Sequence, residues 1–428
     1  PMWCFAGLNK NSAGCLDEYI ERGTVVRSLA NDGAYPGLYY NVMGLTVTDQ
    51  PVNSALGARL FSWTLCMLFL AAGWWVLPRR HRLAYLLVLL VIAVPHGLFL
   101  WASTNPSGVV IAAVSAAWCA AIALLHAEDR RQLALPGALL AVATIAAAGS
   151  RSDGGLYLFI AVAAATALVW RPDRETVRKS IGVIAVAGVG LVASVLVLTR
   201  RLEATGIGGL TSPQAETPPS GSLWTNVLEV PYFITGNLGL AGIGWLDTPM
   251  PRVVWVSTLI VFSALVFRGI AQTDLAKGVS MVGLLAGLLV VPYYFLWREG
   301  TTVPFHVQPR YVLPLLPVFG YTALYWRRGR SLAGLTVLQL STALTLLTIA
   351  QSAALHRNLR RYVTGIDVRS PNLDAGREWW WEIPLSPNGV WIAGSVAFAT
   401  LAIVLGLAIH SASSPSPGRE PVVDDSYA

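Results

Sequence analysis

Long apolar runs with almost no charge are the feature that most constrains how this chain can fold. A helix needs about 20 apolar residues to cross the hydrocarbon core of a bilayer, and the chain contains eleven runs close to that length. Charged residues make up 12% of the chain and mean hydropathy is +0.56, whereas a soluble domain carries roughly twice that charge fraction. We therefore predict an all-α polytopic membrane protein of about eleven transmembrane helices. The runs cover residues 57–77, 83–103, 109–127, 135–150, 156–170, 180–199, 253–267, 278–297, 311–326, 331–355 and 390–410.

Basic residues between the runs predict how the helices are oriented. Arginines cluster at 79–82 and at 327–330, while the turn at 104–108 is uncharged. Because cytoplasmic loops carry the excess of Lys and Arg, the basic stops are expected inside and the uncharged turn outside. The net charge of +7 is distributed among these stops, so we do not expect nucleic acid as a partner. The same alternation places the C-terminus in the cytoplasm.

The alternation also divides the chain into segments. Runs 135–150 and 156–170 are the shortest, and a tilted, half-buried or re-entrant course is possible for both. The chain opens on a polar outside segment, so we expect at least one preceding helix and a total near twelve. The predicted segments are an extracytoplasmic loop at 1–56, transmembrane helices 1–6 at 57–199, an extracytoplasmic loop at 200–252, transmembrane helices 7–10 at 253–355, an extracytoplasmic loop at 356–389, a last helix at 390–410 and a cytoplasmic tail at 411–428.

Four cysteines fall into two pairs with different expectations. Cys4 and Cys15 lie in the first outside loop, in a compartment that permits disulfides, so we predict a bond between them. Cys66 and Cys119 lie inside apolar runs and are expected to be inert core thiols. The sequence contains no metal-ligand spacing, so no metal site is predicted, although a divalent cofactor cation remains possible.

Aromatic side chains gather in the outside segments, most densely at Trp379, Trp380 and Trp381. Tryptophan is enriched where a membrane meets water, so these residues are consistent with an interfacial belt. A surface that contacts sugar or lipid is the alternative. The sequence leaves both open.

Arginine near the ends of outside helices is the clearest candidate for binding chemistry. The 298–310 loop is compact and ends in Gln-Pro-Arg-Tyr at 308–311, directly before a helix. A guanidinium group offers a permanent, forked cation suited to phosphate. The alternative is an arginine that reaches lipid headgroups along the protein surface. If a ligand binds here, Arg310 should point into an outward-facing cavity at the membrane interface. The candidate phosphate-binding residues are Arg310, Arg151, His306 and Arg298.

A general base would have to be a carboxylate on the outer side. Several outside carboxylates are available and their spacing singles out none of them. The candidates within this chain are Asp17, Glu18 and Asp153.

Several short motifs, in their order and spacing, resemble one known family. They are Tyr-Pro-Gly-Leu-Tyr-Tyr at 35–40 before Ala-Arg-Leu at 58–60, Asn-Pro-Ser-Gly at 105–108, Ser-Arg at 150–151, Gln-Pro-Arg-Tyr-Val-Leu-Pro at 308–314 and Arg-Tyr-Val-Thr-Gly at 361–365. Together they resemble the bacterial multipass family called domain of unknown function 2142, especially its actinobacterial members. The resemblance implies a location in the bacterial cell membrane.

That family is similar to the GT-C superfold of membrane glycosyltransferases. The resemblance implies an inverting transfer of sugar from a polyprenyl-phosphate donor to a glycan or lipid acceptor of the cell envelope, at the extracytoplasmic face. It also implies that the catalytic acid belongs to a stretch upstream of Pro1. Pro309 stands where the family usually has Gly. The motif residues expected to line the pocket are Asn105, Tyr39, Tyr40, Gln308 and Tyr311.

Two other functions are open on the sequence. A transporter or flippase of lipid-linked sugars would commonly show internal repeats and polar or broken helices at the bilayer midplane. We see no convincing repeat, and ionisable residues inside the runs are few. A non-catalytic partner in envelope assembly is the other alternative. In each case membrane lipids are partners.

Overall fold

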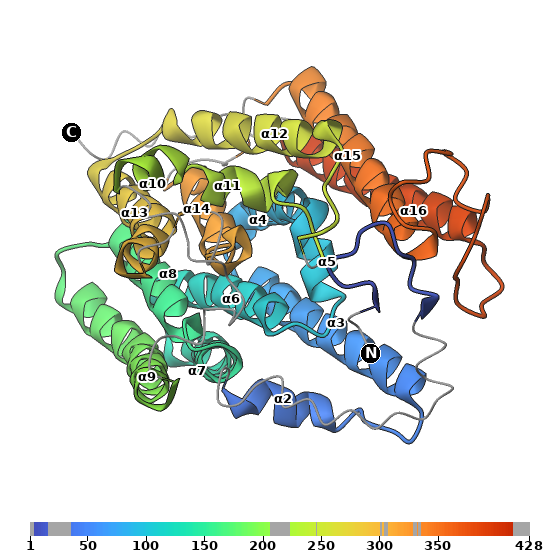
Figure 1. Ribbon diagram of the computed structural model, residues 1–428. Helices are drawn as coiled ribbons and strands as arrows, with labels where there is room; N and C mark the ends of the chain where they lie inside the picture. Colours follow the sequence, from blue (N-terminus) through green and yellow to red (C-terminus); the bar gives the residue numbers. More distant parts are fainter. Residues whose placement is uncertain are drawn as a thin grey trace.

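A computed structural model describes residues 4–15, 36–205, 223–244, 246–299, 302–303, 307–327, 332 and 335–413. Within these residues the protein is a bundle of helices (Figure 1). Nine of the described helices are long and apolar enough to cross a membrane, and two further apolar helices are shorter. These eleven correspond to the eleven predicted runs. The predicted fold class, an all-α polytopic membrane protein, is confirmed.

The helices that cross the bundle are joined by short helices and turns. In chain order the elements are α2 (Gly37–Gly44), α3 (Pro51–Val76), α4 (Arg79–Ile92), η2 (Ala93–Gly97), α5 (Leu98–Trp101), α6 (Pro106–His126), α7 (Arg130–Ser150), α8 (Gly154–Val169), α9 (Arg174–Thr205), α10 (Leu223–Glu229), α11 (Tyr232–Thr235), η3 (Gly236–Leu240), α12 (Arg252–Ile270), α13 (Leu275–Glu299), η4 (Pro309–Tyr311), α14 (Leu315–Leu324), α15 (Val337–Val363) and α16 (Pro387–Ser413).

Several helix lengths differ from those predicted. The run at 135–150 belongs to α7, a helix of 21 residues, which is long enough to cross and needs no re-entrant course. By contrast, α14 has only 10 residues, because its predicted run starts at Tyr311 in the turn η4, continues through turn residues 312–314 and leaves the helix after Leu324. Helix α15 starts at a capping box between Thr336 and Gln339 and continues to Val363, so part of the predicted loop at 356–389 is helical.

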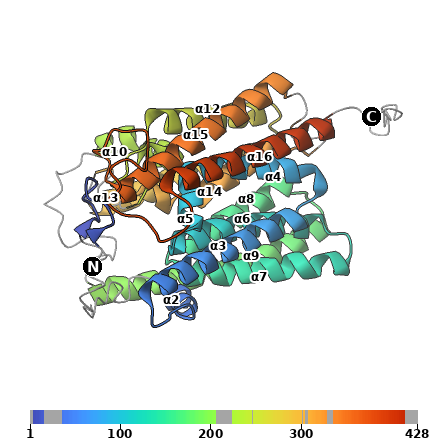
Figure 2. The ribbon, with the colours of Figure 1, turned by 90° about the vertical axis from the view of Figure 1, so that its right-hand side faces the viewer.

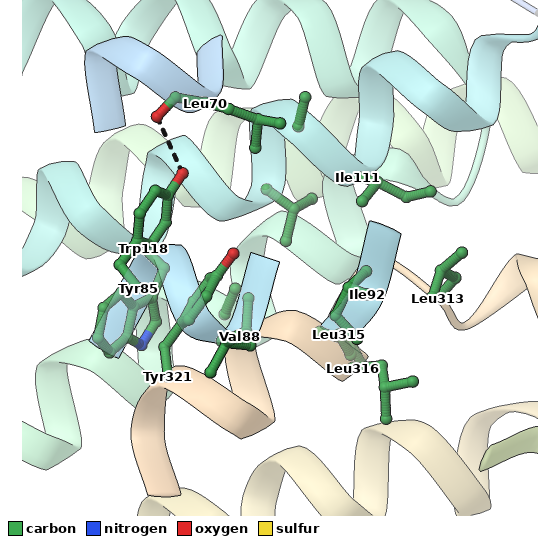
Figure 3. Close-up of a cluster of buried hydrophobic side chains, with 14 of the residues drawn as sticks. Leu70, Tyr85, Val88, Ile92, Ile111, Trp118, Leu313, Leu315, Leu316 and Tyr321 are labelled. Carbon is green, nitrogen blue, oxygen red and sulfur yellow. Dashed lines mark hydrogen bonds between the residues drawn. The ribbon is translucent and has the colours of Figure 1, made fainter. Parts of the chain in front are cut away.

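The core of the bundle surrounds α6, which is buried along nearly its whole length. Small residues allow close approach: the position of a Cβ on Gly73 in α3 would lie 3.2 Å from the Ala116 Cα in α6. Aromatic rings fill the space between α4, α6 and α14, where the Tyr85 hydroxyl donates to the Leu70 carbonyl at 3.1 Å (Figure 3). The outer helices α9 and α16 leave most of their apolar side chains exposed, as expected for helices that face lipid.

Polar contacts show which loops lie together at each end of the bundle. The long helices run between the two ends (Figure 2). At one end, Arg80 donates to the Arg327 carbonyl at 3.2 Å and Lys179 donates to the Ala127 carbonyl. We call this the Arg327 end. At the other end, Arg151 contacts Ser107 and Asp153, and we call this the Arg151 end. The basic stops and the uncharged turn therefore lie at opposite ends, as the alternation predicts. That the Arg327 end is cytoplasmic stays a prediction.

Candidate functional site

Three interruptions of regular helix meet at the Arg151 end of the bundle. The first is η2, where the backbone leaves helical geometry at Val94, just before Pro95. The second is η3, where Gly239 has a φ of +119°, and the third is the 3₁₀ turn η4. Their backbones are in close contact: a Cβ on Gly239 would lie 3.3 Å from the Pro95 Cδ, and a Cβ on Gly236 would lie 2.5 Å from the Pro309 Cγ. Glycine at both positions lets the three turns pack together.

Asn237 fixes the Gln-Pro-Arg-Tyr turn in place. Its side-chain amide donates to the Phe233 carbonyl at 2.7 Å and to the Pro309 carbonyl at 2.8 Å. The turn is closed by the Tyr311 amide, which donates to the Gln308 carbonyl at 2.9 Å. The backbone immediately before Arg310 is thus held by a buried amide from a distant segment. Sequence reasoning did not single out Asn237, although its place between two glycines at 236 and 239 was an available signal.

The Arg310 side chain is half-buried, and among the described residues its Nε is buried without a hydrogen-bond partner. Its guanidinium carbon lies 5.9 Å from the centre of the Tyr311 ring. Unpartnered buried atoms within the same described segments also include the Gln308 Oε1, the Asn237 Oδ1 and the His96 Nδ1. Because a buried polar group without a partner is costly, this cluster has the properties of a site that an external acceptor or donor would complete.

His96 is a member of this cluster that sequence reasoning missed. It lies in η2, is 3% exposed and is within electrostatic reach of Arg310. Ionisable residues inside apolar runs are rare and mark functional sites more often than others do. A histidine beside a proline, in the middle of the run at 83–103, was therefore a usable signal.

Arg151 also lies against the Tyr311 ring, but its guanidinium is hydrogen-bonded to other side chains of the protein. Its guanidinium carbon lies 4.8 Å from the centre of the Tyr311 ring. Its Nη1 donates to the Ser107 hydroxyl at 2.6 Å, its Nε donates to the Asp153 Oδ1 at 2.8 Å, and its Nη2 donates to the other carboxylate oxygen. Burial lowers the pKa of Arg151, but the neighbouring Asp153 carboxylate outweighs it and raises the pKa above its ordinary value. Arg151 is therefore a permanent cation whose charge Asp153 balances.

The residues around Arg151 have mainly structural contacts. The Asn105 side chain accepts from the Ser107 amide at 2.9 Å and caps α6, which presents the Ser107 hydroxyl to Arg151. A Cβ on Gly108 would lie 2.5 Å from the Leu100 carbonyl oxygen, and one on Gly154 would lie 2.0 Å from the Ala147 carbonyl oxygen. Asn-Pro-Ser-Gly and the turn after Ser150 are thus tight packing motifs that hold the arginine.

The remaining predicted site residues fall into two groups. Tyr39 and Tyr40 lie on α2, with ring centres 5.3 Å apart, and burial raises the pKa of Tyr39. A Cβ on Gly149 in α7 would lie only 2.4 Å from the Leu38 Cδ2, so α2 packs beside the helix that leads into Arg151. The second group lies outside the described residues or side chains and comprises Asp17, Glu18, Arg298 and His306.

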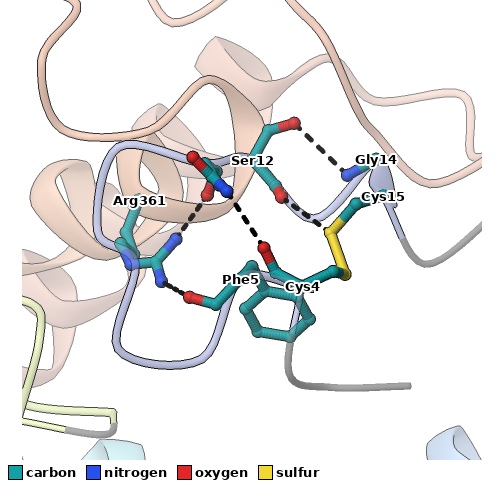
Figure 4. The surroundings of a disulfide bond; sticks show 7 residues. Cys4, Phe5, Ser12, Gly14, Cys15 and Arg361 are labelled. Carbon is teal, nitrogen blue, oxygen red and sulfur yellow. Dashed lines mark hydrogen bonds between the residues drawn. A yellow bond between two sulfur atoms is a disulfide. The ribbon is translucent and has the colours of Figure 1, made fainter.

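A second polar centre surrounds Arg361 and the predicted disulfide (Figure 4). Cys4 and Cys15 are bonded, with their Cα atoms 6.1 Å apart, which confirms the prediction. The Arg361 Nη1 donates to the Asn11 carbonyl at 2.6 Å, and its Nη2 donates to the Phe5 carbonyl and to the Asp247 carboxylate. Arg361 therefore fastens the disulfide loop to the end of α15.

The end of the Arg-Tyr-Val-Thr-Gly motif has the same role. Gly365 has a φ of +85°, and a Cβ there would lie 2.0 Å from the Lys10 carbonyl oxygen. Cys66 and Cys119 are free and buried, as expected for core thiols. Among the described residues, no three His, Cys, Asp or Glu side chains group so as to hold a metal ion.

Comparison with known proteins agrees with the motifs. Residues 3–319 match the family described as "Predicted membrane protein (DUF2142)". The chain belongs to this family. The DUF2142 match includes both Arg151 and the Gln-Pro-Arg-Tyr turn, whereas Arg361 and the whole of α15 and α16 lie beyond it. No curated protein and no solved structure matches the chain.

Proposed function

We propose that this DUF2142 protein is a GT-C-type membrane glycosyltransferase that binds a polyprenyl-phosphate sugar through Arg310. The observation that carries the proposal is the contrast between Arg310 and three other arginines. Arg151, Arg360 and Arg361 are buried and each bonds to protein carbonyl or carboxylate oxygens. The Arg310 Nε, buried where three helix breaks meet, has no partner within the described residues. A guanidinium whose buried Nε has no acceptor in such a place suits a phosphate group.

The position of the site suits a lipid-linked donor. Val94, at the first break, lies about 15 residues along its span from Arg79, or roughly 22 Å of a hydrocarbon core about 30 Å thick. The break is thus about halfway between the midplane and the edge of the core at the Arg151 end. A polyprenyl chain lying in the bilayer would bring its phosphate to this depth from the side, where the extracytoplasmic loops supply the acceptor.

In the proposed reaction the bond between the sugar and the donor phosphate breaks as the acceptor hydroxyl attacks. Negative charge grows on the leaving phosphate, and Arg310 stabilises it. A carboxylate has to take the hydroxyl proton. Asp153 is poorly suited to that step while both of its oxygens accept hydrogen bonds from Arg151, because neither oxygen is then placed to receive the hydroxyl proton.

Broken helices also favour a second candidate, a flippase of lipid-linked sugars. In such proteins the substrate site lies near the bilayer midplane, where both sides can reach it. The displacement of η2 towards one end favours the transferase. The two functions differ in outcome, since only a transferase cleaves the bond between sugar and phosphate.

The test measures binding of undecaprenyl phosphate to the full-length protein in lipid nanodiscs. Arg310→Ala should weaken binding about tenfold to a hundredfold, the loss expected for a charge-assisted contact of about 1.5–3 kcal/mol. Arg310→Lys should recover part of the affinity. Arg268→Ala is the matched control, because Arg268 also stacks on an aromatic ring, Trp326, at 4.7 Å, but at the Arg327 end. Unchanged affinity in Arg310→Ala would make Arg310 a membrane anchor. Transport of an intact labelled polyprenyl-phosphate sugar, without release of free lipid phosphate, would favour the flippase.

A further inference from the structure

The segment between α15 and α16 folds around a hollow that the site above does not use. The hollow has a volume of about 580 Å³ and is lined by residues 377–386. Trp379 and Trp381 form one aromatic pair, with ring centres 4.8 Å apart and planes at 65°. The Trp380 indole N–H donates to the Leu385 carbonyl at 2.8 Å and closes the loop. The ionised side chains among the lining residues are Arg377, Glu378 and Glu382.

This tryptophan loop, residues 377–386, is fastened at both ends. The amides of Glu378 and Trp379 both donate to the Val363 carbonyl at 3.1 Å. At the other end, Asp374 accepts from the Asn388 side chain at 2.8 Å and from the Ser386 hydroxyl at 3.0 Å. Both ends of the loop are therefore held by the protein before any ligand arrives, which reduces the entropy cost of binding.

The height of the loop argues against a role as an interfacial belt. His356 and Trp391 face each other with ring centres 5.0 Å apart, at the level where the apolar part of α15 gives way to its arginines. The Val363 carbonyl accepts from the Trp379 amide. Val363 is seven residues beyond His356 on α15, or about 10 Å at 1.5 Å per residue. Each headgroup layer is only about 5–7 Å thick. Belt tryptophans lie at headgroup level, whereas the Trp379 amide is bonded to Val363, about 10 Å beyond His356 by this estimate.

The lining also has the chemistry of a sugar site. Indole rings offer flat apolar faces on which the C–H faces of a sugar ring can stack. Glu378 and Glu382 can accept hydrogen bonds from sugar hydroxyls, and Arg377 can donate to ring or hydroxyl oxygens. Two exposed carboxylates would be poorly placed against anionic lipid headgroups. The volume lies in the range of small-molecule sites, about 300–1,000 Å³.

We propose that the tryptophan loop is a saccharide-binding site that holds a water-exposed glycan chain. Its identity as the acceptor of the transfer reaction rests on the proposed function, but binding of a saccharide does not. The tryptophan loop contacts the disulfide loop, because a Cβ on Gly14 would lie 3.5 Å from the Trp379 Cβ. Arg361 connects the disulfide loop to Asp247. Asp247 follows η3, whose Asn237 bonds to Pro309 beside Arg310, so the tryptophan loop and Arg310 both belong to the Arg151 end.

The experiment uses full-length protein in nanodiscs and three soluble probes: cellohexaose, maltohexaose and mannohexaose. Binding is measured by saturation-transfer NMR and isothermal titration calorimetry. At least one hexasaccharide should bind, and Trp379→Ala and Trp381→Ala should each weaken it tenfold or more. Trp391→Phe is the matched control, because the Trp391 indole bonds to Ser352 within the helices, and it should bind as the unchanged protein does. Thermal unfolding of each variant checks that it is folded.

A second measurement tests the height of the loop. A nitroxide on Glu382→Cys should collide more often with an aqueous nickel chelate than with oxygen dissolved in lipid. Three outcomes would each overturn the proposal. They are failure of all three probes to bind, binding in Trp379→Ala and Trp381→Ala that equals binding in the unchanged protein, and a nitroxide buried in lipid. Arg310→Ala should leave hexasaccharide binding unchanged. Loss of lipid-phosphate binding alone, or of saccharide binding alone, therefore tells which of the two proposals has failed.

Discussion

Arg361 and Asp247 form an ion pair with 2.6 Å between the Nη2 and Oδ2 atoms, although 114 residues separate them in the chain. The two side chains are 1% and 6% exposed. Asp247 also accepts from the Gly7 amide at 3.2 Å. One carboxylate therefore joins the end of α15, the turn after η3 and the disulfide loop.

Neutralising this carboxylate should be strongly destabilising. Asp247→Asn keeps the shape of the side chain but leaves the Arg361 charge buried without a counterion, which costs about 3–5 kcal/mol. Denaturant titration in micelles measures the loss. Glu175→Gln is the control, because Glu175 is 60% exposed where it pairs with Lys179 one turn along α9, and a solvated helix pair contributes about 0.5 kcal/mol or less. Equal, small effects in both variants would contradict the role assigned to Asp247.

Arg151 and Arg310 should respond in opposite ways to removal. Arg151→Ala leaves Asp153 without its cation and Ser107 without its donor, so we expect a loss of about 3 kcal/mol in the free energy of unfolding. Arg310→Ala removes a buried Nε that has no partner in the described part of the chain, so stability should be unchanged or slightly higher. Thermal unfolding of both variants without ligand gives the comparison. A destabilised Arg310→Ala would show that the protein itself satisfies this arginine.

Gly155 in α8 and Gly182 in α9 offer a matched pair of substitutions. A Cβ on Gly155 would lie 2.0 Å from the Gly190 carbonyl oxygen in α9, whereas a Cβ on Gly182 would meet nothing within 4 Å. Gly155→Ala should force α8 and α9 apart and cost about 3 kcal/mol. Gly182→Ala should gain up to about 1 kcal/mol from helix propensity. Melting temperatures in detergent should therefore shift in opposite directions. A Gly155→Ala variant as stable as the unchanged protein would show that α8 and α9 are further apart than this contact indicates.

Single cysteines can establish which end of the bundle faces the cytoplasm. Thr104 and Arg174 are both exposed and belong to opposite ends. In intact cells, a membrane-impermeant maleimide should label Thr104→Cys, and it should label Arg174→Cys only after permeabilisation. The buried thiols of Cys66 and Cys119 give little background. The reverse pattern would invert the predicted orientation and move Arg310 to the cytoplasmic face.

Most of the membrane architecture could be predicted from the sequence alone. Apolar length and the placement of arginines are local properties, and the bilayer responds to them directly. The eleven runs therefore correspond to eleven of the described helices, and Arg80 and Arg327, from two of the basic stops, lie at one end of the bundle. The Cys4–Cys15 bond was predictable for a similar reason, since two cysteines close in sequence can meet without help from the rest of the fold.

Helix limits were less predictable where polar residues join a helix. The arginines at the end of α15 look like loop residues because they are charged. In the fold these arginines are helical, and carbonyls outside the helix accept from them: Arg360 donates to the carbonyls of Ser370 and Asn372, and Arg361 to those of Phe5 and Asn11. No local pattern encodes these partners.

Only the tertiary structure decided which arginine is available to a ligand. In the sequence, Arg151, Arg310 and Arg361 each stand in a short motif near a helix end. In the fold, Asp153 and Ser107 engage the first and Asp247 engages the third, while the Arg310 Nε is left without a partner among the described residues. His96 and Asn237 join Arg310 because three helix breaks pack together. Charge and apolar length are local properties of the sequence. Whether a buried polar group has a hydrogen-bond partner depends on which distant groups the fold brings to it.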